Sequence, residues 1–144
     1  MNLRSNKIKT ILWLGWPLLV IGGLLMYRSF SGQGTAGQKI YQMHCASCHM
    51  AEGEGLRQLI PPLRQADYFV TNGLNMACII RNGLNTPIKV NGVDYNRPMP
   101  GNILLSPAEI TAVIGYIQKK WYPRLPEVNF QEVEAALQNC DPNQ

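Results

Sequence analysis

The first 51 residues contain no aspartate or glutamate, and the first acidic residue of the 144-residue chain is Glu52. The formal net charge of +4 is carried by four basic residues near the N-terminus, Arg4, Lys7, Lys9 and Arg28. From residue 31 onward nine basic residues are matched by nine acidic ones, so this larger part has no formal net charge. Because DNA and RNA binding requires a basic surface, the sequence excludes nucleic acid as a partner.

Charge is also absent from the seventeen residues Ile11–Tyr27, which are mostly apolar. A run of this length is at the lower end of what spans a membrane as a helix. Three basic residues precede it and one follows, which predicts a cytoplasmic N-terminus and an exported remainder. A cleaved secretory signal is the alternative. We favour an uncleaved anchor, because the run exceeds a typical signal core and Arg28 closes it before any A-x-A cleavage site.

Cysteine and histidine are scarce, with four and two copies. Three of the six form the motif C-x-x-C-H at Cys45, Cys48 and His49, which is the attachment sequence for a c-type haem. Two thiols on one helical turn can each add to a haem vinyl group, and the imidazole that follows can bind the iron. Zinc and thiol-redox sites are the alternatives, but Cys78 and Cys140 stand alone and supply no second ligand pair. We therefore expect one covalently attached haem c.

An iron held by His49 needs a second ligand, or it stays open to small molecules. His44 precedes the motif directly and Met50 follows it directly, so both belong to the attachment side. Met76 falls in a helical pattern, where core packing is the commoner role. Met99 lies between two prolines in a stiff loop, which suits a side chain that must reach a fixed point. The sequence therefore predicts Met99 as the second axial ligand.

Apolar periodicity and end signals predict four helices. The first runs from Gly37 into the motif, and a second covers 66–81, closed by Asn82 and Gly83. Two capping boxes, Ser106 with Glu109 and Asn129 with Glu132, begin helices at 106–121 and 129–139. Between the second and third helices we expect an ordered loop at 86–102 with a short hairpin around Asn91 and Gly92.

These motifs, in this order, resemble those of the class I monohaem cytochromes c over about Ala36 to Trp121. Gly37 and Tyr41 have the family's spacing to C-x-x-C-H, and residues 96–100, Asn-Arg-Pro-Met-Pro, match its methionine loop. Tyr116 matches the aromatic residue of the closing helix, which packs on the first helix. Pro61-Pro62-Leu63 matches the family's P-x-L turn. The resemblance implies that the Pro61 carbonyl accepts the Nδ1 hydrogen of His49.

The resemblance implies a mainly α cytochrome c fold, with three to four core helices around the haem. We expect an anchor at 1–30, a linker at 31–37, a haem domain at 38–125 and a C-terminal helical extension at 126–144. An exported chain lies in an oxidising compartment, so we expect a disulfide between Cys78 and Cys140 that joins the extension to the haem domain. The alternative is two buried free thiols.

Two axial ligands leave the iron no vacant site, so we expect a one-electron carrier and not an enzyme. By resemblance to cytochrome c subunits of bacterial respiratory complexes, the membrane-anchored domain would lie on the periplasmic face of the inner membrane. It would carry electrons between a quinol-oxidising complex and a terminal oxidase or other acceptor, as a shuttle or as a fixed subunit. The alternatives are a haem enzyme or gas sensor with a labile distal ligand, and a structural or assembly subunit.

Overall fold

A computed structural model describes residues 35–141 of the chain. The expected anchor at 1–30, its apolar run Ile11–Tyr27 and most of the expected linker lie outside these residues. Among residues 35–141, no helix is long and apolar enough to cross a membrane.

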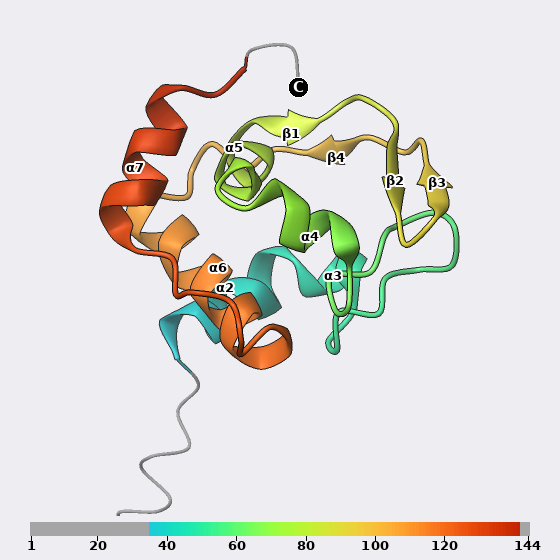
Figure 1. Cartoon of the computed structure of the whole chain (residues 1–144), viewed down its shortest axis with the longest axis horizontal. Coiled ribbons are helices and arrows are strands. Elements are labelled where there is room, and N and C mark those ends of the chain that lie inside the picture. The colour runs from blue at the N-terminus through green and yellow to red at the C-terminus, as the bar shows by residue number, and fades with distance from the viewer. Residues whose placement is uncertain (1–34, 142–144) are drawn as a thin grey trace, which may run out of the picture. The chain divides into compact units, whose positions relative to one another are not determined.

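The described part of the chain is mainly helical, as expected (Figure 1). Its helices are α2 (Ala36–His44), α3 (Ala46–His49), α4 (Asp67–Asn72), α5 (Asn75–Asn82), α6 (Pro107–Trp121) and α7 (Phe130–Gln138). Its strands are β1 (Gly83–Leu84), β2 (Ile88–Val90), β3 (Val93–Tyr95) and β4 (Met99–Pro100). The side chain of Thr35 caps α2 by accepting a hydrogen bond from the amide of Gln38. Residues 36 and 37, assigned to the linker from the sequence, are therefore helical.

The first helix packs directly on the closing helix α6. A Cβ at Gly37 would overlap the carbonyl oxygen of Ala112, so this glycine lets the two backbones approach closely. Next to this contact Tyr41 is only 1% exposed, and its ring lies 5.5 Å from the rings of both Tyr116 and Trp121. The expected packing of Tyr116 on the first helix is confirmed.

The prediction of a single helix at 66–81 is wrong, because Gly73 separates this segment into α4 and α5. Gly73 has φ +44°, a left-handed conformation that ends α4 at Asn72. The expected end of the second helix is confirmed, since Gly83 follows Asn82 with φ +87°. The periodic apolar pattern continues across Gly73, which is why it suggests one helix where the backbone makes two.

The segment 86–102 contains the expected hairpin, and it also contains β4, one strand of a second pair that the sequence did not predict. Asn91 and Gly92, with φ +50° and +80°, join the antiparallel strands β2 and β3. Strand β4 pairs with β1 in the register Leu84 opposite Met99. Two-residue strands have no alternation to recognise, so this pair leaves no local signal in the sequence. The pairing of β4 with β1 places the methionine loop, residues 96–100, beside the end of α5.

The C-terminal helix α7 packs on α5 and α6, along one side of the fold (Figure 1). Val133 of α7 is completely buried. The expected disulfide joins Cys78 of α5 to Cys140, 62 residues later, with a Cα–Cα distance of 5.5 Å. Both expected capping boxes are present, at Ser106 and Asn129. Phe130, the first residue of α7, is 40% exposed.

Candidate functional site

A cavity of about 490 Å³ opens between the helices and the strands, and every segment from the end of α2 to β4 contributes to its wall. All five site residues expected from the sequence line it: Cys45, Cys48, His49, Pro61 and Met99. Most of the remaining wall is apolar and comes from the segment after α3, from α4 and α5 and from the strands, namely Leu56, Leu59, Ile60, Leu63, Phe69, Met76, Ile79, Leu84, Ile88 and Val90.

Cys45 lies between α2 and α3, Cys48 lies within α3, and neither cysteine forms a disulfide. The amide of His49 donates to the carbonyl oxygen of Cys45 at 2.9 Å, which closes one helical turn across the motif. Burial, and secondarily the neighbouring Cys48, raises the pKa of the Cys45 thiol to about 11. The burial that opposes a thiolate there does not oppose a thioether, since a thioether carries no charge.

His49 is the one buried polar or charged residue among residues 35–141, at 7% exposed. Its Nδ1 lies 3.0 Å from the carbonyl oxygen of Pro61. Because a carbonyl can only accept, Nδ1 carries the hydrogen and Nε2 keeps its lone pair. Burial lowers the pKa of His49, although the Pro61 carbonyl acts in the opposite direction. A lowered pKa favours the neutral imidazole at neutral pH, and this is the form that binds a metal.

Glycines after the motif allow the chain to return so that Pro61 faces His49. The amide of Gly55 donates to the carbonyl oxygen of His49 at 3.1 Å. Gly55 has φ +70°, and a Cβ on it would lie 2.7 Å from the carbonyl carbon of Pro61. The carbonyl oxygen of Gly53 accepts from the amide of Leu63 at 2.8 Å. The partners of these glycines come from the far side of the loop, so the local sequence gives no sign of these contacts.

Met99 reaches the cavity from β4, and its side chain is half-buried. Its position is fixed by pairing with Leu84, and beyond it the amide of Asn102 donates to the carbonyl oxygen of Ile80 at 2.8 Å. A second thioether, that of Met76 on α5, lines the same cavity and is 8% exposed. The cavity therefore holds two methionines, the one on β4 predicted as a ligand and the one on α5 assigned to the core.

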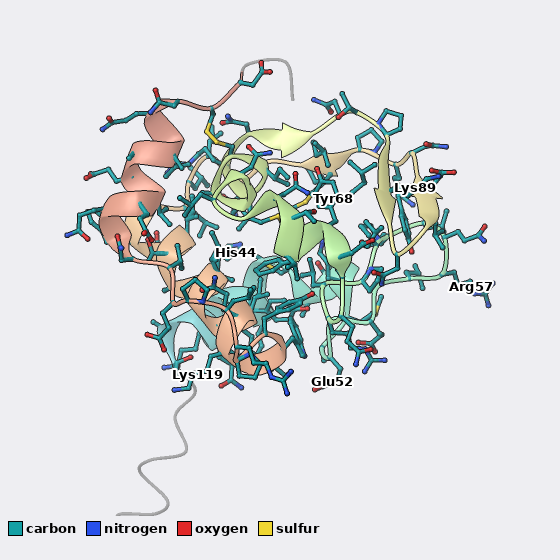
Figure 2. All side chains as sticks on the ribbon, in the orientation of Figure 1. His44, Glu52, Arg57, Tyr68, Lys89 and Lys119 are labelled. Atoms are coloured by element: carbon teal, nitrogen blue, oxygen red, sulfur yellow. A yellow bond between two sulfur atoms is a disulfide. The ribbon has the colours of Figure 1, made fainter. Side chains whose placement is uncertain are left out.

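Polar groups also reach the cavity wall. His44, assigned from the sequence to the attachment side, lines the cavity, and its Nδ1 lies 3.3 Å from Nδ2 of Asn102. Tyr68 of α4 also lines it, and burial raises the pKa of its phenol. Figure 2 labels both side chains, of which His44 is exposed and Tyr68 is half-buried. The cavity is thus apolar in most of its wall, with few polar contacts.

The residues present fit a covalently attached haem. The cavity volume lies in the range of cofactor sites, and its wall is largely apolar. Two unpaired thiols stand at the attachment spacing, beside an imidazole whose Nδ1 is already bonded. Within residues 35–141, no group of three or more His, Cys, Asp or Glu side chains is arranged to hold a metal ion by itself.

Comparisons with known proteins agree with this chemistry. The Cytochrome c family model matches residues 34–121. A cytochrome c-552 of Thermus thermophilus is 32% identical over 107 residues, covering 72% of this chain and 68% of that protein. The cytochrome c subunit of a quinone alcohol dehydrogenase from Gluconobacter oxydans is 32% identical over 97 residues, which cover 66% of this chain and only 20% of that subunit. The chain therefore belongs to the cytochrome c family, which transfers electrons and binds covalently attached haem c, and its Cys45 and Cys48 fit the C-x-x-C-H attachment site of that family.

Proposed function

We propose that this cytochrome c is a membrane-anchored one-electron carrier in which His49 and Met99 are the axial ligands of the iron. The observation that carries the proposal is that both side chains line one cavity, with Nδ1 of His49 bonded to the carbonyl of Pro61 at 3.0 Å. Haem c supplies a one-electron ferric/ferrous couple when bound. Neutral imidazole and thioether are the ligand pair that raises the potential of such a couple.

The chain's own residues favour electron transfer over bond chemistry. Cys45 and Cys48 fix the cofactor, the Pro61 carbonyl orients His49, and the apolar wall excludes water. With two protein ligands the iron keeps no vacant position for oxygen or peroxide. The protein thus acts as a carrier or an electron-transfer subunit, and bond chemistry takes place in its partners.

The anchor and the partners are part of the same proposal. The uncharged run Ile11–Tyr27, with three basic residues before it, would hold the haem domain on the periplasmic face of a bacterial inner membrane. Confinement to that plane raises the effective concentration of membrane-bound partners, here a quinol-oxidising complex and a terminal oxidase or other acceptor. One relative is named as the cytochrome c subunit of a quinone alcohol dehydrogenase. This name supports the proposal that the present protein is a fixed subunit of a larger complex.

Exchanging each methionine of the cavity separately tests the ligation. Met99→Leu should abolish the sulfur-to-iron charge-transfer band of the ferric protein, while the matched variant Met76→Leu should keep it. A band lost in Met76→Leu and kept in Met99→Leu would reassign the ligand to α5. A wild-type protein with high-spin ferric haem that binds carbon monoxide readily when reduced would favour the enzyme or sensor alternative.

Localisation is tested with the full chain and a variant that starts at residue 31 behind a cleavable export signal. Both should attach haem, but only the full chain should sediment with membranes and resist extraction by high salt. Gentle detergent purification of the full chain should bring a quinol-oxidising complex or an oxidase with the haem. Recovery of the full chain in the soluble periplasmic fraction would contradict the anchor.

A further inference from the structure

Tyr122 follows α6 directly and does not line the cavity, yet its side chain contacts the segment that does. The amide of Ala66 donates to the phenol oxygen at 2.7 Å, and the phenol donates in turn to the carbonyl oxygen of Leu63. The carbonyl oxygen of Ala66, at 3.3 Å, is a weaker second acceptor. The hydroxyl group of Tyr122 thus hydrogen-bonds to two backbone positions, 56 and 59 residues earlier in the chain, and links them to the end of α6.

The ring of Tyr122 contacts the same part of the cavity wall. It stacks on Phe69 of α4, with 4.8 Å between the ring centroids and 7° between the planes. Phe69 is 4% exposed and lines the cavity, as do Leu63 and Ala66. Tyr122 therefore contacts three residues of the wall from behind, through its hydroxyl group and through its ring.

The hydrogen bonds of the Tyr122 hydroxyl group matter because the neighbouring prolines cannot fix their own positions through backbone amide hydrogen bonds. Pro61 and Pro62 have no amide hydrogen, and the carbonyl of Pro61 is already bonded to His49. The next residue, Leu63, is held on both sides: its amide donates to the carbonyl oxygen of Gly53 at 2.8 Å, and its carbonyl accepts from Tyr122. The direction of the Pro61 carbonyl therefore depends on how firmly Leu63 is fixed.

We infer that Tyr122 is a positioning residue of the haem site, which acts through Leu63 to hold the Pro61 carbonyl against Nδ1 of His49. The inference rests on the proposed role of His49 as an iron ligand. A firmly held carbonyl acceptor makes the imidazole a stronger electron donor, which stabilises ferric haem. Burial raises the pKa of the Tyr122 phenol, so the hydroxyl stays protonated and able to donate at neutral pH.

The test removes the hydroxyl and keeps the ring. Tyr122→Phe should raise the reduction potential, so that at a fixed ambient potential the ferrous-to-ferric ratio rises by about threefold, a modest change because the hydroxyl acts on His49 only through Leu63 and Pro61. Tyr122→Leu, which also removes the stack on Phe69, should shift the ratio further. The matched control is Tyr116→Phe, which removes a phenol from α6 whose ring packs on Tyr41.

Spectroelectrochemical titration measures the ratio, and thermal unfolding of the same holoproteins measures stability. If Tyr122→Phe unfolds at a lower temperature but keeps the reduction potential of the wild type, Tyr122 is merely structural and the inference is overturned. An equal shift in Tyr116→Phe would overturn it as well. If Tyr122→Leu does not accumulate as a haem-containing protein, the reduction potential of Tyr122→Phe alone decides the role of Tyr122. A wild-type protein without the sulfur-to-iron band would refute the proposed Met99 ligation, while the potential difference would still decide the role of Tyr122.

Discussion

Asp67 and Asn91 each bind the other's backbone amide through a side-chain oxygen. The amide of Asp67 donates to Oδ1 of Asn91 at 3.0 Å, and the amide of Asn91 donates to Oδ1 of Asp67 at 2.7 Å. Nδ2 of Asn91 also donates to the carbonyl oxygen of Gln65 at 2.9 Å. This reciprocal pair joins the tip of the β2–β3 hairpin to the start of α4, two segments that both line the cavity.

Replacing Asn91 should therefore loosen one side of the cavity. Asn91→Ala removes two hydrogen bonds and places alanine at φ +50°, a conformation that asparagine tolerates better. We expect a loss of about 1–3 kcal/mol in the free energy of unfolding, measured by denaturant titration of the holoprotein. Asn85→Ala, at an exposed position of the loop before β2, is the control and should change stability little. Equal effects of the two changes would show that the pair contributes nothing specific.

Gly55 offers a direct test of the loop that brings Pro61 to His49. Gly55→Ala combines the strain of φ +70° with a collision against Ile60 and Pro61, whereas Gly73→Ala at φ +44° meets no atom within 4 Å. We expect Gly73→Ala to lower the free energy of unfolding by about 1 kcal/mol and Gly55→Ala by about 2–4 kcal/mol. Only Gly55→Ala should also alter the optical spectrum of the haem. An unchanged spectrum would mean that the Pro61 carbonyl does not depend on this loop.

The disulfide should contribute much of the stability of the C-terminal part. Cys78→Ser together with Cys140→Ser opens a covalent loop of 62 residues, which gives an expected loss of about 2–4 kcal/mol. Guanidinium titration of the variant, and of the wild type with and without a thiol reductant, measures it. The reduced wild type should match the double variant, since the haem thioethers resist reduction. A variant as stable as the oxidised wild type would assign the stability to packing of Val133 instead.

The capping box of α6 predicts a pH dependence. The pKa of Glu109 lies below its ordinary value, mainly because the amide of Ser106 donates to its carboxylate at 2.8 Å and the hydroxyl of Ser106 donates at 2.7 Å. A lowered pKa in the folded state means that ionised Glu109 stabilises the protein above its unfolded pKa, and that this is lost as pH falls through the folded pKa.

Glu109→Gln should therefore lower the melting temperature at neutral pH, and the difference from wild type should shrink as the pH falls from about 4.5. Melting curves from about pH 7 to about pH 3 measure this, with the exposed Glu127→Gln as the control. A difference that stays constant over this range would show that the charge of Glu109 is not involved.

Short-range signals predicted much of this structure. The C-x-x-C-H motif, the capping boxes at Ser106 and Asn129 and the turn at Asn91 each lie within a few residues, so local physics specifies them. The resemblance, not spacing alone, pointed to Pro61 as the partner of His49.

Other features depend on residues far apart in the chain. The pairing of Leu84 with Met99 and the contact of Tyr122 with Leu63 form only after the chain has folded back on itself. The break at Gly73 was missed for another reason, since the apolar periodicity on its two sides is almost continuous and gives no sign of a left-handed residue.

The C-terminal extension is joined to the fold at a point that matters for the haem. Met76 and Ile79 of α5 line the cavity, and Cys78 between them binds Cys140 just beyond α7. Residues 35–141 lie in one compact unit, and within it α7 packs on α5 and α6. Proteolysis or truncation that removes α7 would uncover the outer side of α5, the same helix whose inner side encloses the cofactor.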